Sequence, residues 1–306
     1  MSKENQLSWF SFAPTLFVLM WATGFIGAKY GLPHAGPFSF LSVRYAIVIV
    51  VLLVVAFLAH APWPRSPAEF IHAIFSGFLL HGVYLGGVFL AISLGMSAGI
   101  SALIVGLQPL MTSVLSGPLL KERITSWHWL GVMLGLIGMS LVLLPKISGS
   151  GHGVSSLSLT ALVAAFVALF GMTLGTIYQK AFAVKFDLRT GGVLQNIGAL
   201  VPTGIAAYCL EGFDITWTWE FIGALSWLVL VLSIGAISLL MLIIRHGDVS
   251  KVSTLFYLVP PVTVVMAFFL FGERISLTQA AGIALAVFAV AMTRKPMKSV
   301  NTGAKK

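Results

Sequence analysis

Apolar stretches about as long as a bilayer is thick recur along the whole chain, separated by short polar turns. A helix needs about 20 mostly apolar residues to cross the hydrocarbon core. In lipid every backbone N–H and C=O must be satisfied internally, which favours helices for runs of this length. The pattern predicts an all-α polytopic membrane protein with ten transmembrane helices, at 12–31, 39–60, 70–92, 97–119, 127–145, 158–179, 190–210, 221–244, 250–271 and 277–293.

The second half of the chain repeats the first at a constant offset of 151 residues. The offset aligns "KERI" at 121–124 with "GERI" at 272–275, and it aligns Lys29 with Lys180. Each half holds five predicted spans, an odd number, so the second copy would insert upside down. We therefore expect two inverted five-helix repeats, at 12–145 and 158–293, with cytoplasmic tails at 1–11 and 294–306.

Composition and charge agree with this architecture. The chain is 58% hydrophobic and 9% charged, with a net charge of +9. Its basic residues are scattered between apolar segments, which favours membrane orientation over nucleic-acid binding. With the N-terminus inside, 14 Lys and Arg lie on the inner side and 3 on the outer, so both termini are expected in the cytoplasm.

Several kinds of chemistry are absent from the sequence. Cys209 is the single cysteine, so no internal disulfide forms, and no metal site or cofactor is expected. No P-loop motif occurs, so ATP is not the direct energy source. All nine carboxylates fall in predicted loops or at span ends. Any coupling would use His81, Glu122 or Glu273, or the solute gradient itself.

Particular motifs resemble a known group of transporters. They are the opening "WATGFIGAKYG" at 21–31, the residues Pro37, Phe38 and Arg44 that follow, and a Glu-Arg turn in each half. Together with the two five-span halves, they resemble the drug/metabolite transporter superfamily and, within it, the EamA-type exporters. The resemblance implies export of amino acids, metabolites or toxic compounds, or exchange of sugars and nucleotide sugars, without enzymatic activity.

Polar and aromatic side chains within the spans point to a substrate cavity. A lipid-facing His81, Gln108 or Gln195 would be costly, so these side chains are expected to face the interior. An aromatic-rich interior with a few amides suits a small, partly apolar solute, although the same groups also hold helices together. The cavity candidates are Trp21, Arg44, His81, Tyr84, Gln108, Tyr178, Gln179, Gln195, Asn196, Trp227 and Tyr257.

Two readings of Arg44 remain open at this point. It lies about one turn inside the second span, where it either snorkels to the interface or presents its charge to an anionic group such as a carboxylate. Lys29 and Lys180 are expected at opposite membrane interfaces. Pro109, Pro260 and Pro261 are predicted mid-span, where they either hinge or statically kink their helices.

The Glu-Arg turns are expected to be structural. Ser126 or Thr125, and Ser276 or Thr278, can cap the helices that follow them, and a carboxylate is favourable near a helix N-terminus. The residues concerned are Glu122, Arg123, Glu273 and Arg274.

The function that these features predict is secondary transport, most simply export of an amino acid or similar metabolite by alternating access. We expect a multi-pass protein of a bacterial inner membrane. Its partners would be a small-molecule substrate and the lipid bilayer, with no nucleic acid, and it would be a monomer or homodimer. A passive facilitator is one alternative. The other is an intramembrane serine hydrolase, because Gly95–Gly99 reads G-x-S-x-G around Ser97. The competing interpretation of Ser97 is a helix N-cap after a tight external turn.

Overall fold

The computed structural model describes residues 3–120, 126–147, 158–182, 187–239, 243, 256–273 and 275–292. The α-helices of this part are α1 (Lys3–Gly31), α2 (Pro37–Leu58), α3 (Pro67–Gly77), α4 (Tyr84–Ser93), α5 (Ala98–Gly106), α6 (Gln108–Leu120), α7 (Ser126–Ile147), α8 (Leu159–Phe182), α9 (Leu188–Ala206), α10 (Trp219–Trp227), α13 (Val259–Phe271) and α14 (Leu277–Met292). Three π-helical segments continue α3, α9 and α10: η2 (Phe78–Val83), η3 (Ala207–Glu211) and η4 (Leu228–Ala236). Short 3-10 turns form η1 (Leu32–His34) and η5 (Phe256–Leu258).

The helices have the length and composition of membrane spans. Six described segments are long and apolar enough to cross a bilayer: Phe12–His34, Pro37–Leu58, Pro67–Ser93, Leu159–Phe182, Leu188–Glu211 and Trp219–Leu239. Four shorter apolar helices accompany them, at Ala98–Thr112, Trp129–Leu143, Val259–Phe271 and Leu277–Met292. Large apolar side chains such as Phe57 and Phe269 are exposed on the outside, where lipid would cover them. The chain is therefore an all-helical, multi-pass membrane protein.

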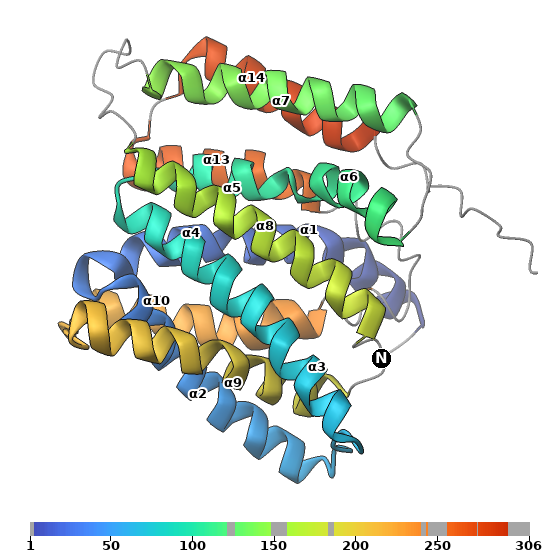
Figure 1. Cartoon of the computed structure of the whole chain (residues 1–306), viewed down its shortest axis with the longest axis vertical. Helices are drawn as coiled ribbons and strands as arrows, with labels where there is room; N and C mark the ends of the chain where they lie inside the picture. Colours follow the sequence, from blue (N-terminus) through green and yellow to red (C-terminus); the bar gives the residue numbers. More distant parts are fainter. Residues whose placement is uncertain are drawn as a thin grey trace, which may run out of the picture.

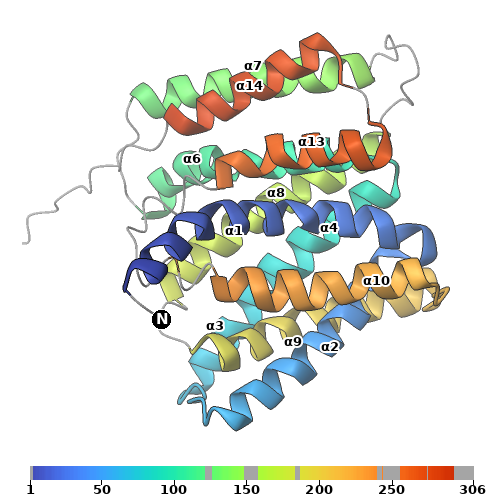
Figure 2. The same ribbon diagram turned by 180° about the vertical axis from the view of Figure 1, so that it is seen from behind.

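The helices stack in successive pairs across the molecule. Helix α7 lies beside α14 at one edge, α5 packs on α13 in the next layer, and α2 packs on α9 near the other edge (Figures 1 and 2). The turns at 32–36, 94–97 and 212–218, together with residues 272–273 and 275–276, gather at one end of the bundle, on the left of Figure 1. We call this the Lys29 end, and the other the opposite end.

Small residues let the paired helices approach closely. A Cβ added at Gly138 of α7 would lie 2.7 Å from the Gly282 carbonyl oxygen of α14. At Gly77 of α3 an added Cβ would clash with the backbone of Gln195 in α9. These contacts are the close approaches that small residues permit in membranes. The contact at Gly77 fixes α3 against α9 beside the site described below.

The helix starts follow the capping rules. Ser97 is the N-cap of α5, and its Oγ accepts a hydrogen bond from the Ile100 N–H at 3.4 Å, as predicted. Gly95 in the preceding turn has φ +93°, a conformation that glycine adopts without strain. Ser276 and Gln279 form a reciprocal capping box at α14, since each side chain accepts from the other's backbone N–H at 3.2 and 3.0 Å.

Asp187 caps α9 at the opposite end of the bundle. It accepts hydrogen bonds from the backbone N–H and the guanidinium of Arg189. The guanidinium hydrogen bonds hold the pKa of the Asp187 carboxyl below its usual value.

The fourth predicted span is not one kinked helix. It consists of α5 and α6, with a break at Leu107 and with Pro109 in the first turn of α6. Pro260 and Pro261 likewise lie in the first turn of α13, directly after η5. These prolines therefore lie in the first turn of a helix and not in the interior of one continuous helix. A proline lacks an N–H and has a fixed φ, so it fits the first turn, where no intrahelical acceptor is needed.

Glu211, at the end of η3, holds the start of α2. Its carboxylate accepts hydrogen bonds from the Phe38 N–H at 3.0 Å, the Ser39 N–H at 2.7 Å and the Ser39 Oγ at 2.6 Å. Gly36 makes room for it, because an added Cβ there would meet the carboxylate. A charged acceptor at a helix N-terminus satisfies orphan N–H groups and complements the helix dipole.

Replacing Glu211 with Ala should destabilise the folded protein by about 1–3 kcal/mol, because it strands N–H donors at the start of α2. Thermal unfolding of the purified protein measures the loss. Asp214→Ala is the matched control, since Asp214 is an exposed carboxylate whose side chain has no hydrogen bond in the described part. Equal effects of the two substitutions would contradict this account of Glu211.

Candidate functional site

A cavity of about 410 Å³ lies in the middle of the bundle, within the size range of small-molecule sites. It is enclosed by α1, α2, η2, α4, α8, α9 and η4. Its lining residues are Trp21, Gly24, Phe25, Arg44, Tyr45, Val48, Leu52, Leu80, His81, Tyr84, Leu85, Val88, Phe89, Met172, Thr176, Gln179, Leu188, Gly192, Gln195, Asn196, Leu232, Ser233, Ile237 and Phe256. The cavity reaches the opposite end of the bundle, because Leu188 is the first residue of α9 and Gln179 lies in the last turn of α8.

Arg44 is the only Lys or Arg among these lining residues, which include no Asp or Glu. Its side chain is 4% exposed and does not reach the protein surface. One guanidinium nitrogen, Nη2, donates to the Ser233 hydroxyl at 3.1 Å. The Nε is buried and has no hydrogen-bond partner in the described part of the chain. The cavity wall thus carries a buried charge without a carboxylate to balance it.

Two π-helical segments bond neighbouring residues of α2 at this point, η4 through Arg44 and η2 through Tyr45. The Tyr45 hydroxyl donates to the His81 carbonyl in η2 at 2.8 Å. The Ser233 hydroxyl, which accepts from Arg44, donates to the Leu228 carbonyl within η4 at 3.1 Å. A π-turn shifts backbone hydrogen bonds to i→i+5 and is frequent at functional sites. Side chains of α2 and η4 therefore bind carbonyls of the π-helical segments beside the cavity.

The amide side chains line the cavity from α9. Gln195 Nε2 donates to the Ser76 hydroxyl of α3 at 3.2 Å, and Asn196 Nδ2 donates to the Gly192 carbonyl at 2.8 Å. Each amide thereby uses an N–H on the protein. The Gln195 side chain also hydrogen-bonds the His81 ring. The Asn196 amide oxygen has no hydrogen-bond partner among the described residues, so it can accept a hydrogen bond from a solute.

Aromatic rings form another part of the wall. Trp21 and Phe256 meet edge to face at 5.2 Å between centroids, and Phe17 packs on both. Beside them a side cavity of about 30 Å³ is lined by Gln108, Pro109 and Pro260, among others, and shares Trp21 and Phe256 with the main one. Rings of this kind provide a large apolar contact area for a ligand.

Most of the predicted cavity residues meet in this space, and three of the others do not. Trp21, Arg44, His81, Tyr84, Gln179, Gln195 and Asn196 line the main cavity. Gln108 lines only the side cavity, and its Nε2 donates to Thr112 at 3.1 Å. Tyr178 points toward α3, where its hydroxyl bonds His72 Nδ1 at 2.6 Å. Trp227 is 47% exposed, and its indole donates to Thr23. The Tyr257 side chain lies outside the described residues.

The Lys29 end of the bundle is closed by an ion pair. Lys29 of α1 binds the Glu273 carboxylate, and its Nζ lies 4.5 Å from the centre of the Phe271 ring. The same carboxylate oxygen accepts the Ala98 N–H at the start of α5 at 3.3 Å. Glu273 is thus near a helix N-terminus as predicted, although the helix is α5 rather than α14. Glu122, Arg123 and Arg274 lie outside the described residues.

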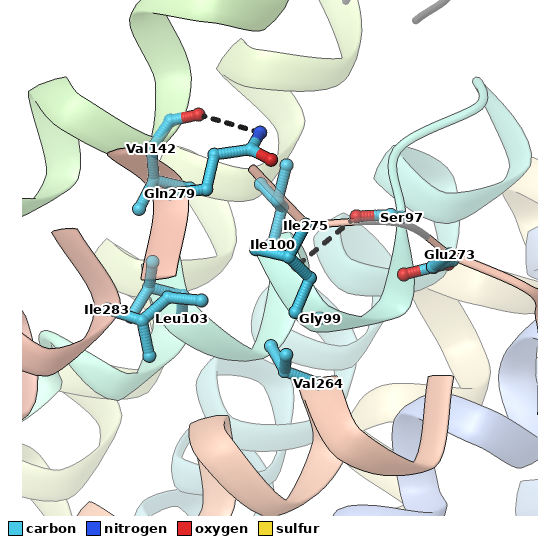
Figure 3. Close-up of a pocket in the computed structure, with 10 residues that line it drawn as sticks. All are labelled: Ser97, Gly99, Ile100, Leu103, Val142, Val264, Glu273, Ile275, Gln279 and Ile283. Atoms are coloured by element: carbon cyan, nitrogen blue, oxygen red, sulfur yellow. Dashed lines mark hydrogen bonds between the residues drawn. The ribbon is translucent and has the colours of Figure 1, made fainter. Parts of the chain in front are cut away.

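Ser97 and Glu273 border a small hollow of about 30 Å³ (Figure 3). The other lining side chains are mostly apolar, and none of them is a histidine. In Figure 3 the Ser97 oxygen is engaged with the first turn of α5, and Gln279 reaches the Val142 carbonyl of α7, at 3.4 Å. The hollow is of water size, so this place offers no room for an organic solute.

The model of the EamA-like transporter family matches the chain twice, at residues 9–144 and 159–294. The chain belongs to this family. An uncharacterized transporter of Archaeoglobus fulgidus is 24% identical over 90% of this chain and 95% of its own length. A probable amino-acid metabolite efflux pump of Salmonella typhimurium is 25% identical over 90% and 91%.

A solved crystal structure has the same fold as this EamA-like chain. It covers 93% of the chain and 96% of its own, with a TM-score of 0.63 and 17% sequence identity. The family and its relatives named as transporters make this chain a membrane transporter for a small molecule and not an enzyme. The serine hydrolase alternative for Ser97 is thereby wrong, and the N-cap interpretation remains.

Sequence reasoning about this EamA-like chain missed several cavity residues. Tyr45 and Ser233 hold the π-helical segments and Arg44, and Thr176 lines the cavity one helical turn from Met172. The offset of 151 residues was the available signal, because it aligns Tyr45 with Asn196 and Phe25 with Thr176, and all four line the cavity. Ser233 had no such signal.

Cysteine labelling tests whether the cavity is aqueous. In a Cys209→Ser background, Thr176→Cys should react with a small charged thiol reagent in native membranes. Leu174→Cys, whose position is 39% exposed on the outer face of the same helix, is the control. We expect Thr176→Cys to react roughly tenfold faster or more, because only a hydrated thiol ionises readily. Equal rates would mean that the cavity holds no water.

Proposed function

We propose that the protein is a secondary transporter that exports a small, partly apolar metabolite, such as an amino acid or a similar compound, by alternating access. The observation that carries the proposal is a solute-sized cavity that reaches one end of the bundle, while an ion pair closes the other end. Relatives named probable amino-acid metabolite efflux pumps, from Salmonella typhimurium and Escherichia coli, support the direction of transport.

The proposed architecture is ten spans in two inverted repeats, at 12–145 and 158–293. The helix pairs α2 with α9, α5 with α13, and α7 with α14 support it, since each joins spans that the 151-residue offset aligns. The π-helical segments η2 and η4 also fall at aligned positions. Binding sites of inverted-repeat transporters lie near the midplane where the repeats meet.

The proposed orientation follows from the distribution of Lys and Arg. Both termini lie in the cytoplasm of a bacterial cell, and the Lys29 end faces outward. The cavity then extends toward the cytoplasm, where an exporter takes up its solute. The outer end is held by the Lys29–Glu273 pair and by Glu211 on α2. We propose that one chain, alone or in a homodimer, completes the cycle when these outer contacts separate.

Transport by reconstituted protein tests the proposal. Proteoliposomes loaded with a panel of amino acids and related metabolites should show saturable uptake of labelled solute that is stimulated by the same solute on the opposite side. Such counterflow is expected of a carrier, because its site faces one side at a time. Flux without saturation or counterflow would instead indicate a passive facilitator, and no flux of any solute would sink the proposal.

Locking the outer end should stop the cycle. Lys29→Cys and Glu273→Cys, combined in a Cys209→Ser background and bridged by a short bifunctional thiol reagent, should reduce transport to the level of protein-free liposomes. The physical reason is that α1 can no longer separate from the turn between α13 and α14. Each single cysteine variant treated with the same reagent is the control. Full transport by the bridged protein would show that these two segments stay together throughout the cycle.

A further inference from the structure

The unbalanced charge in the cavity points to the chemistry of the solute. We propose that Arg44 binds a carboxylate of the transported solute and that the preferred solutes are net-anionic monocarboxylates with an apolar body. This inference rests on the proposed transport function and narrows its substrate class. It starts from the buried Arg44 Nε, which has no partner among the described residues.

A buried guanidinium without a counter-ion is unfavourable, because the protein interior replaces its hydration shell poorly. Among the described residues Arg44 donates one side-chain hydrogen bond, to the Ser233 hydroxyl, although a guanidinium carries five N–H donors. With 4% of its surface exposed, the side chain cannot snorkel to a membrane interface. An anion that enters the cavity would supply the missing acceptors and charge. A carboxylate matches the planar donor fork of arginine and binds it in a bidentate manner.

Helix α9, which packs on α2, brings amides rather than a second charge to the cavity wall. Gln195 occupies the position that the 151-residue offset aligns with Arg44, and both side chains line the cavity. Gln195 uses its amide on Ser76 and His81, so the amide oxygen of the neighbouring Asn196 remains for a neutral donor of the solute. Among the described residues, no carboxylate lines the cavity to pair with an ammonium group. A zwitterion would therefore leave its ammonium without a counter-charge, whereas a monocarboxylate leaves nothing unbalanced.

The rest of the cavity fits an apolar body. Phe25, Met172, Leu232 and Phe256 contribute apolar surface from α1, α8, η4 and η5. A volume of about 410 Å³ accommodates a branched aliphatic or a one- or two-ring aromatic acid. Burial of that body in an apolar cavity adds to the binding free energy.

Matched probes separate charge recognition from shape. Isovalerate, phenylacetate and indole-3-acetate should each raise the melting temperature of the purified protein more than the corresponding amide, because ligand binding stabilises the folded state. Phenylacetate should also bind more tightly than phenylalanine. Amides that bind as well as the acids, or phenylalanine that binds better than phenylacetate, would overturn the assignment.

Variants of Arg44 show whether it binds the solute or only supports the fold. In Arg44→Gln, acid binding should weaken about 10- to 100-fold, the loss expected for charge-assisted hydrogen bonds. The ligand-free protein should melt no lower than wild type, because a buried unbalanced charge has been removed. Arg44→Lys should retain part of the preference for acids over amides. Arg65→Gln is the matched control, since it removes the same charge at an exposed position that does not line the cavity, so acid binding should persist.

The outcomes distinguish this inference from the proposed function. If Arg44→Gln melts lower without ligand and still binds acids like wild type, Arg44 is structural and the assignment is wrong. If no acid binds while neutral solutes are transported in proteoliposomes, the substrate class is wrong and transport stands. If no solute of any charge is bound or transported, the transport proposal fails as well.

Discussion

Hydrocarbon offers no hydrogen-bond partners, so the polar groups of a membrane protein must find theirs in the space between its helices. The rest of this structure depends on that constraint. Backbone groups freed at helix ends and π-turns find partners inside the protein, as the Glu211 carboxylate does for α2 and the Tyr45 hydroxyl for η2. Arg44 is the extreme case, because one hydroxyl satisfies only part of its guanidinium. Most polar groups of the interior thus have hydrogen-bond partners that stabilise the fold, whereas the Arg44 Nε has none among the described residues.

The closeness of some helix pairs defines the cavity as much as its lining does. Where Gly138 meets Gly282 and where Gly77 meets α9, backbones touch and no solute fits between them. Larger side chains hold the remaining helices apart around Arg44. Small residues and large ones therefore divide the interior into contacts that close it and a space that stays open. Glu273 adds a third device, because one carboxylate joins α1 to the N-terminus of α5.

Hydropathy predicted the helical, multi-pass fold, because each helix that crosses the bilayer needs a run of about 20 apolar residues, which can be recognised in the sequence. Solvation cost also predicted that His81 and Gln195 face inward, but it left Arg44 open and could not assign Gln108 and Tyr178 to one interior space or another. Tyr178 finds its partner in His72, which lies 106 positions away. The Lys29–Glu273 pair joins residues 244 positions apart, beyond any local signal. The π-helical segments escaped prediction because "FLLHGV" and "LVLVLSIGA" have no composition that separates them from α-helix.

The matched positions of η2 and η4 give these two spans an internal freedom that a plain helix lacks. A π-turn holds one residue more than a turn of the surrounding α-helix. The extra residue rotates the side chains of one half of the span relative to those of the other half. Absorbing that residue into regular α-helix would turn every downstream side chain by roughly 100° about the axis, the rotation per residue of an α-helix. His81 lies within η2 and Ser233 lies within η4. The faces that these spans present to α2 would then rotate with only about 1.5 Å of added helix length, the rise of one residue, and without moving the tight glycine contacts of α7 and α14.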